Sequence, residues 1–373
     1  MAEVPDAHIP LPDGELAGWI TESDEPAPTA LSPIDDSMPA KVAVRRLKGG
    51  EVLLWTGDYH NGRQLLKAIK KRLTPRARRN PASLTDQWRA ERAKTSRQAQ
   101  VLGRLVVALE SDGALNLRRA PDTRQAVHWA WDLKEQKHLV PLRTLIGSLG
   151  SAGWRREGVE VQGLHGRIYP WYGVFSPTRQ VYISLLEHIG EVADLSILDV
   201  GCGTGVLSFV LLQRGAAAAT GTDIEERAVR CAQFNGEALG LDARFQAVQA
   251  DLFLPEQRFD RIVFNAPWML GTPATRLDRA IFDEGGQTLR RWLTGLPAHL
   301  NPQGVGLLLL SDLPERLGLR GEEEVEAAIE QAGLHIQHMH TKPARHGKAK
   351  DIKDPLHQAR AAEQIRLYTL SPR

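Results

Sequence analysis

The sequence predicts an α/β fold, in which a mostly parallel seven-stranded sheet with an antiparallel last strand follows a smaller N-terminal α/β domain. Three observations predict it. From residue 197 onward, short apolar runs alternate with stretches of helical periodicity. A glycine-rich turn joins the first of these runs to the next helical stretch. Polar residues then follow the ends of successive runs, where parallel sheets bind their ligands.

The glycine-rich turn is the most informative part of the chain. Ile197, Leu198 and Val200 indicate a short strand, and the residues from 207 to 212 indicate an apolar helix. Between them, glycines occupy positions 201, 203 and 205. Glycine has no Cβ and adopts backbone angles that other residues avoid, so a ligand can approach this backbone closely. We therefore expect a ligand on this turn.

The spacing of the turn indicates which ligand. A dinucleotide-binding turn has the pattern G-x-G-x-x-G, but position 206 is Val206. This disfavours nicotinamide and flavin cofactors. Asp199 lies where it could pair with a cationic amino group, and Asp223 follows a second apolar run, where a carboxylate can accept both ribose hydroxyls. An adenosine that bears an amino acid, S-adenosylmethionine, suits both positions.

Four segments together resemble the class I methyltransferases, which have a Rossmann-like sheet. They are Asp199–Gly205, Asp223, Asp251-Leu252-Phe253 and Asn265-Ala266-Pro267-Trp268. More narrowly, they resemble the small-domain group with an Asn-Pro-Pro-aromatic motif, which includes release-factor glutamine N5, ribosomal-RNA guanine N2 and adenine N6 methyltransferases. The resemblance covers about residues 165 to 370. Asp278 and residues 281–287 further resemble the segment after the motif in the protein glutamine enzymes.

The resemblance implies a site for the cofactor and a site for the methyl acceptor. The implied cofactor-binding residues are Phe175, Thr178, Arg179, Asp199, Gly201, Gly203, Thr204, Gly205, Asp223, Ile224, Asp251 and Leu252. The implied catalytic residues are Asn265, Ala266, Pro267 and Trp268. In such enzymes the asparagine oxygen and the next carbonyl accept hydrogen bonds from a planar NH2, and the aromatic residue stacks on the group that carries it.

Two features of this region need comment. Ala266 stands where the family has proline, but Pro267 still biases residue 266 toward extended backbone angles. The two cysteines, Cys202 and Cys231, do not form a metal-binding pattern, since a zinc site needs four ligands at motif spacing. We therefore expect S-adenosylmethionine and no metal.

The periodicity predicts elements along the whole chain. Strands are expected near residues 51–55, 197–200, 219–223, 244–249, 260–264 and 304–311, with an antiparallel pair near 334–340 and 364–370. Helices are expected at 65–73, ending near Pro75, at 84–109 with a capping box of Ser83 and Asp86, at 180–189, and from 289. The long connection between the last two strands, residues 341–362, is basic and was expected to be functional or disordered.

Charge divides the N-terminal part of the chain. Residues 1–40 carry nine Asp or Glu and no Lys or Arg, which predicts a disordered, proline-rich arm. Residues 41–119 carry nineteen Lys or Arg against six Asp or Glu. We expect residues 41–160 to form a basic substrate-recognition domain and residues 161–373 the methyltransferase domain. Without an apolar run of about 18 residues or a signal pattern, a cytoplasmic location is expected.

The function expected from the sequence is methyl transfer to a planar amino or amide nitrogen. A base in structured RNA, favoured as ribosomal RNA, is the leading target because a basic region suits a polyanion. The basic helices could equally be a solvated surface. The alternatives are a glutamine side chain of a translation protein, a small molecule, or a non-catalytic binding protein with the same fold, which only Ala266 favours.

Overall fold

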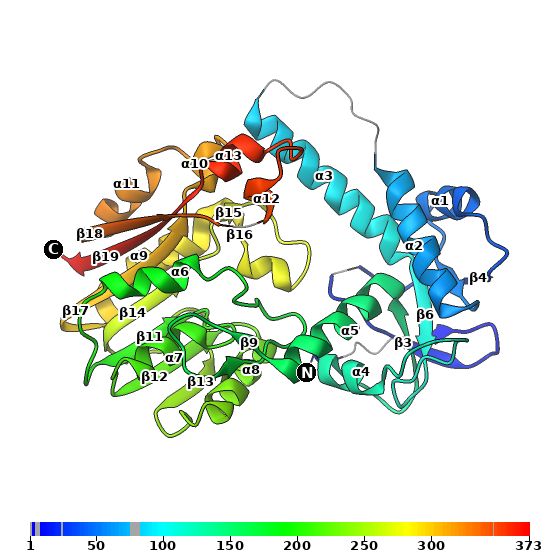
Figure 1. Cartoon of the computed structure of the whole chain (residues 1–373), viewed down its shortest axis with the longest axis horizontal. Helices are drawn as coiled ribbons and strands as arrows, with labels where there is room; N and C mark the ends of the chain where they lie inside the picture. Colours follow the sequence, from blue (N-terminus) through cyan, green and yellow to red (C-terminus); the bar gives the residue numbers. More distant parts are fainter. Residues whose placement is uncertain (1, 4–7, 24, 75–82, 346) are drawn as a thin grey trace. The chain divides into compact units, whose positions relative to one another are not determined.

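A computed structural model describes residues 2–3, 8–23, 25–74, 83–345 and 347–373 (Figure 1). The chain divides into two compact units. Unit 1 comprises Met1–Pro81 and Arg89–Gly153, and unit 2 comprises Ala82–Trp88 and Trp154–Arg373. The expected boundary at residue 160 thus lies inside unit 2. Within the described ranges, no helix has both the length and the apolar character needed to cross a membrane.

Unit 2 is built on the predicted seven-stranded sheet, with strand order β13-β12-β11-β14-β17-β19-β18. The strands are β11 (Ser196–Val200), β12 (Ala218–Asp223), β13 (Phe245–Gln249), β14 (Phe259–Asn265), β17 (Leu300–Ser311), β18 (Leu334–Pro343) and β19 (Gln364–Pro372). The first five pair in parallel, and β19 runs antiparallel to both of its neighbours. The predicted fold class and strand positions are confirmed.

Alternation along the strands creates two apolar faces in unit 2. Ile197 and Leu307 pack into one cluster, and their neighbours Leu198 and Leu308 pack into another. Helices α6 (Val181–Ser184), α7 (Val206–Gln213) and α8 (Glu226–Ala238) contribute to the first cluster. Helices α9 (Gln287–His299) and α11 (Glu324–Gln331) contribute to the second. Both faces of the sheet are therefore buried, as a parallel sheet requires.

Short elements complete unit 2. They are β9 (Val159–Glu160), β10 (Arg167–Ile168), η1 (Leu185–His188), β15 (Met269–Leu270), η2 (Leu277–Ala280), β16 (Phe282–Asp283), η3 (Glu284–Gly286), α10 (Leu313–Arg316), α12 (Gly347–Lys350) and α13 (His357–Ala361). The helix expected at 180–189 is split into α6 and η1. The long basic connection contains the end of β18 and the short helices α12 and α13.

Unit 1 contains a six-stranded sheet of order β2-β3-β8-β6-β5-β4. Its strands are β2 (Ile9–Pro10), β3 (Leu16–Trp19), β4 (Ser32–Ile34), β5 (Leu53–Trp55), β6 (Leu105–Leu109) and β8 (Lys137–Pro141). A separate pair joins β1 (Ala2–Glu3) to β7 (Trp131–Asp132).

The expected disordered arm is wrong for the described part of residues 1–40. Three strands of the six-stranded sheet lie there, and β3 pairs in parallel with β8. Trp19 and Ile20 are 4% and 1% exposed. The acidic composition of the segment predicted disorder, but its few apolar residues are buried against the sheet. Their burial stabilises the folded segment.

The helices of unit 1 are α1 (Ala40–Lys48), α2 (Tyr59–Leu73), α3 (Leu84–Gly103), α4 (Arg124–Ala130) and α5 (Leu142–Glu157). The first turn of α3 and the end of α5 belong to unit 2. Ser83 caps α3 as expected, since its hydroxyl accepts a hydrogen bond from the Asp86 N–H at 3.1 Å, and the same hydroxyl donates to Asp86 Oδ2 at 2.8 Å. The stop expected at Pro75 lies outside the described residues. The helix expected to reach residue 109 ends at Gly103, because Leu105–Leu109 is a buried, β-branched run that joins the sheet.

The incorporation of the N-terminal strands can be tested at two positions of β3. Trp19→Ala should lower the free energy of unfolding by about 3–5 kcal/mol, because the side chain is fully packed. Leu16→Ala is the matched control: Leu16 is 51% exposed, so its removal should change that free energy by at most about 0.5 kcal/mol. Urea unfolding followed by circular dichroism measures both. Equal, negligible effects would show that these residues do not belong to the folded unit.

Candidate functional site

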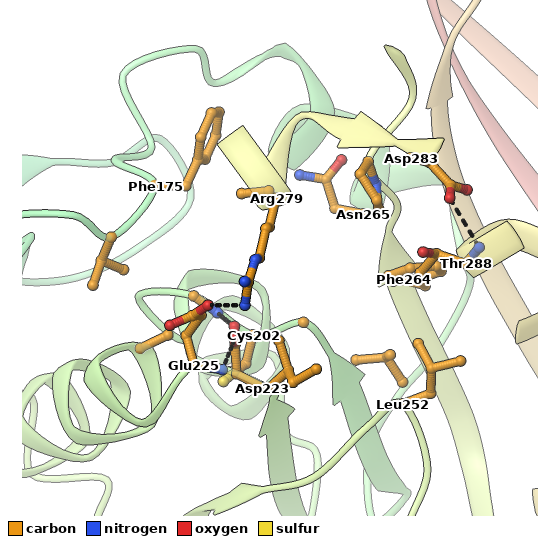
Figure 2. Close-up of a pocket in the computed structure, with 18 of the residues that line it drawn as sticks. Phe175, Cys202, Asp223, Glu225, Leu252, Phe264, Asn265, Arg279, Asp283 and Thr288 are labelled. Carbon is orange, nitrogen blue, oxygen red and sulfur yellow. Dashed lines mark hydrogen bonds and ion pairs between the residues drawn. The ribbon is translucent and has the colours of Figure 1, made fainter. Parts of the chain in front are cut away.

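A cavity of about 400 Å³ lies in unit 2 where β11, β12 and β14 end (Figure 2). Strand-end residues and the glycine-rich turn line one part of it. Nine of the implied cofactor-binding residues line the cavity: Phe175, Asp199, Gly201, Gly203, Thr204, Asp223, Ile224, Asp251 and Leu252. Asn265 and Pro267 also line it. The parallel topology therefore brings most of the predicted site together at one edge of the sheet.

The glycine-rich turn uses backbone angles that suit glycine. The φ angles of Gly201, Gly203 and Gly205 are +63°, +55° and +79°. A Cβ on Gly203 would meet nothing within 4 Å, so this backbone has space beside it. A Cβ on Gly205 would lie 2.6 Å from Phe209, and Gly205 does not line the cavity. Gly203 thus leaves room for a ligand, whereas Gly205 allows the start of α7 to pack.

Asp199 is a buried carboxylate, 1% exposed, that lines the cavity. Its Oδ2 atom accepts hydrogen bonds from the backbone N–H and the hydroxyl of Ser208, at 3.1 and 2.8 Å. Burial raises the pKa of Asp199 to about 7, the two bonds from Ser208 oppose that rise, and the nearby Asp223 adds to it. A cationic group in the cavity would favour the ionised form of Asp199.

Asp223 ties the glycine-rich turn to the end of β12 (Figure 2). Its Oδ2 accepts a hydrogen bond from the Gly203 N–H at 3.0 Å, and its Oδ1 accepts one from the Glu225 N–H at 2.9 Å. Burial is the main cause that raises the pKa of Asp223. The carboxylate is thus fixed at the cavity wall, with its neighbour Ile224 half exposed beside it.

Asn265, the last residue of β14, carries an unused acceptor. Its Oδ1 atom is buried and has no hydrogen-bond partner among the described residues. A buried amide oxygen without a partner costs about 1–3 kcal/mol, and a donor that enters the cavity could recover this energy. Asn265 is the residue from which the resemblance predicts recognition of an NH2 group. The orphan acceptor is therefore the part of the cavity best suited to bind an N–H donor.

Other residues of the predicted motif lie elsewhere. Ala266 is completely buried in an apolar cluster. Trp268 is half-buried against two apolar clusters, one of which includes Met269 and Leu313, and it does not line the cavity. This tryptophan therefore packs against apolar side chains, including Met269 of β15 and Leu313 of α10, outside the cavity.

Of the implied cofactor-binding residues Phe175, Thr178 and Arg179, only one lines the cavity. Phe175 lines the cavity. Thr178 and Arg179 are exposed and lie outside the lining. The preceding turn is instead anchored through Arg227, which is 6% exposed and donates a hydrogen bond to the Tyr172 carbonyl at 3.2 Å.

Much of the opposite wall comes from a segment that the strand-end pattern did not identify. Its cavity-lining residues are Pro273, Arg276, Leu277, Arg279, Ala280, Phe282, Asp283, Glu284, Gln287, Thr288 and Arg291. Because the segment lies between strands, no strand-end residue marks it. The resemblance of residues 281–287 to the glutamine enzymes was the one available signal.

Two ion pairs connect this segment to the strand ends. Arg279 Nη1 lies 2.9 Å from Glu225 Oε1 (Figure 2), and Arg291 Nη2 lies 2.8 Å from Asp251 Oδ2. Asp251, one of the implied cofactor-binding residues, therefore already has a cationic partner. Asp283 fixes the start of α9 by accepting hydrogen bonds from the backbone N–H groups of Thr288 and Leu289, at 2.9 and 3.0 Å.

These features fit an adenosine joined to a positively charged amino acid. Gly203 leaves room for the ligand, Asp223 offers a fixed carboxylate near a half-exposed apolar side chain, and Asp199 can balance a cation. The unused oxygen of Asn265 adds an acceptor for a second molecule. The cavity can thus hold a cofactor and position a nitrogen.

Comparison with known proteins identifies the same region. Residues 167–292 match the family "Methyltransferase small domain". A Methanocaldococcus jannaschii protein named as a protein N5-glutamine methyltransferase is 28% identical over 186 residues, which are 48% of this chain and 89% of that protein. A release factor glutamine methyltransferase of Cereibacter sphaeroides is 33% identical over 37% of this chain and 52% of its own length.

A solved structure of ribosomal protein L11 methylase from Lactobacillus delbrueckii aligns with a TM-score of 0.36 and 20% identity, over 52% of this chain and 77% of that one. The chain spans about half of the Cereibacter relative and about a third of an L11 methyltransferase from Neisseria meningitidis. The chain therefore carries, at residues 167–292, a region that matches the methyltransferase small domain, and its relatives in this region are named as methyltransferases.

Proposed function

We propose that the enzyme methylates the side-chain amide nitrogen of a glutamine in a protein of the translation apparatus. The observation that carries the proposal is the buried Oδ1 of Asn265, which faces no hydrogen-bond donor among the described residues although it belongs to a cavity-lining side chain. A primary amide supplies the planar N–H donor that this oxygen lacks. The names of the Methanocaldococcus and Cereibacter relatives support the same target.

In this proposal the chain positions both reactants. S-adenosylmethionine supplies a methyl group on a positively charged sulfur. Gly201, Gly203 and Thr204 present the loop backbone to it, Asp199 pairs with its ammonium group, and Asp223 accepts its ribose hydroxyls. Ile224 and Leu252 pack on the adenine, and Phe175 covers the amino-acid end.

The chemical step depends on the motif at the end of β14. Asn265 Oδ1 and the carbonyl of Ala266 accept the two N–H bonds of the amide and hold its nitrogen in line for attack. Accepting both hydrogens draws electron density toward the nitrogen. The proton that the nitrogen loses after transfer passes to water, so a strong base is not needed. Pro267 holds the motif in an extended conformation.

Trp268 helps to distinguish the candidate targets. A base that presents its amino group would stack on the aromatic residue of the motif, but the half-buried Trp268 packs against two apolar clusters and does not line the cavity. An amide at the end of a flexible side chain needs no such platform. This placement favours glutamine over a nucleobase.

A base amino group in RNA, with ribosomal RNA favoured, remains the second candidate. The observation that favours it is the row of cationic residues on α2, including Arg63, Lys67 and Lys70. The two targets can be separated by incubating the protein with cofactor labelled in the methyl group and with ribosome-containing lysate. Label that survives nuclease but not protease supports glutamine, and label lost with nuclease supports RNA. Label in neither polymer would contradict both.

The role of Asn265 can be tested by substitution. Asn265→Ala should leave binding of S-adenosylhomocysteine within about twofold of the original, but should lower methyl transfer by at least about 100-fold, because one of the two acceptors is lost. Asn301→Ala is a control, since Asn301 bonds Asp260 in the same unit and does not line the cavity. Calorimetry and label incorporation measure the two effects. Full transfer by Asn265→Ala would disprove amide recognition by this residue.

The proposed role of Asp199 gives a pH dependence. Its pKa of about 7 means that the carboxylate is mostly protonated at pH 5.5 and mostly ionised at pH 7.5, while the ligand's amino group remains largely protonated. Affinity for S-adenosylhomocysteine should therefore increase severalfold from pH 5.5 to 7.5. In Asp199→Asn the affinity should be lower and this increase should vanish. An unchanged pH profile in that variant would assign the titration to another group.

A further inference from the structure

A second cavity, of about 630 Å³, lies within unit 1 between α2, α3 and α5. We call it the basic groove. It is lined by His60, Arg63, Gln64, Leu66, Lys67, Lys70, Thr95, Gln98, Ala99, Leu102, Arg143 and Ile146. This lining contains three arginine or lysine residues from α2 and one arginine from α5, but no aspartate or glutamate. The groove is therefore a concentration of positive charge that the catalytic cavity does not use.

One face of α2 forms the charged wall. His60, Arg63, Lys67 and Lys70 follow one another at intervals of three and four residues, which places them along the same side of the helix. Their side chains are exposed. Leu65 and Ile69 on another side of α2 are buried. Because the helix is held by that apolar side, the charged side is presented as a fixed row.

The three cations of this row, Arg63, Lys67 and Lys70, are not paired with acidic side chains in the described part of the chain. Within the described ranges, Arg63, Lys67 and Lys70 take part in no ion pair, although other cations of the unit do, such as Arg46 with Glu51 and Lys94 with Glu91. A row of exposed cations without acidic partners is destabilised by mutual repulsion, and a bound anion relieves that repulsion.

The other side of the groove supplies polar donors and an apolar floor. Thr95 and Gln98 come from α3, and Arg143 of α5 donates a hydrogen bond to the Ala99 carbonyl at 2.8 Å, which fixes its guanidinium against α3. Leu66, Leu102 and Ile146 form the apolar part. The lining contains no Phe, Tyr or Trp on which a base could stack.

We propose that the basic groove binds the phosphate backbone of a single-stranded RNA segment. From His60 to Lys70 the row extends about 15 Å along α2, long enough to follow several phosphates rather than one. Arginine and lysine are the usual phosphate partners, and because phosphate contacts carry no sequence information, binding through this row should show no base preference. The inference does not rest on which nitrogen unit 2 methylates, because a protein target held on RNA and an RNA target would both require it.

The test compares two variants of the full chain that lose the same charge. The groove variant is Arg63→Gln, Lys67→Gln and Lys70→Gln. The control variant is Lys41→Gln, Lys48→Gln and Lys71→Gln, which alters exposed lysines of α1 and α2 outside the groove lining. Fluorescence anisotropy with a labelled mixed-sequence RNA of 20 nucleotides, over a salt series, measures affinity.

The groove variant should bind at least tenfold more weakly than the control variant at 0.1 M salt. Its slope of log affinity against log salt should be smaller by about 2, since each phosphate contact to a single strand contributes about 0.7. Equal losses in both variants, or no loss in either, would overturn the assignment to this groove. If polyglutamate of equal charge displaces the RNA as well as unlabelled RNA does, the groove binds acidic chains and the RNA assignment is wrong.

A second measurement uses the unaltered protein and avoids any effect of substitution on folding. Acetylation of lysines, read by mass spectrometry, should be slowed by RNA at least threefold at Lys67 and Lys70, and little at Lys41 and Lys48. Uniform protection or none at Lys67 and Lys70 would contradict the proposal. Neither assay requires methyl transfer, so their outcome is separate from that of the proposed function.

Discussion

The catalytic unit depends on two buried carboxylates that hold the glycine-rich turn. Asp223 accepts a hydrogen bond from the Gly203 N–H in the middle of the turn, and Asp199 accepts bonds from the N–H and hydroxyl of Ser208 in the first turn of α7, so both the turn and the helix that follows it are held. Burying a carboxylate is costly unless hydrogen bonds satisfy it, and the raised pKa of each group reflects that cost. The same arrangement leaves negative charge facing a cavity with room for a cationic ligand.

The cavity is formed by the strand ends of the sheet and by the segment of residues 273–291. The strand ends are rigid because the sheet is buried on both faces, whereas the segment from 273 to 291 reaches them through side-chain ion pairs, Arg279 with Glu225 and Arg291 with Asp251. Since the four side chains are partly exposed, these pairs are weak individually. The segment is also held by the pairing of β15 with β16 and by the bonds that Asp283 accepts at the start of α9.

Unit 1 presents a different kind of surface. Its charged groove is built on α2, whose N-terminus is capped by Asp58 through hydrogen bonds from the N–H groups of His60 and Asn61. Asp58 also forms ion pairs with Arg118 and Arg119, and the hydrogen bond from Arg119 lowers the pKa of Asp58 and keeps it ionised. The helix that carries the cationic row is thus anchored at its start, and the row itself can remain available for an anion.

The sequence by itself determined the strands of the sheet, the glycine-rich turn and most strand-end residues of the cavity, because these depend on local periodicity and on glycine. Tertiary structure alone decided the rest. Trp268 lies outside the cavity because it packs against two apolar clusters, and Leu105–Leu109 is a strand because neighbouring strands pair with it. The acidic N-terminal segment folded because β8, more than a hundred residues away, binds its backbone. These features depend on contacts between residues far apart in the sequence, which local periodicity does not reveal.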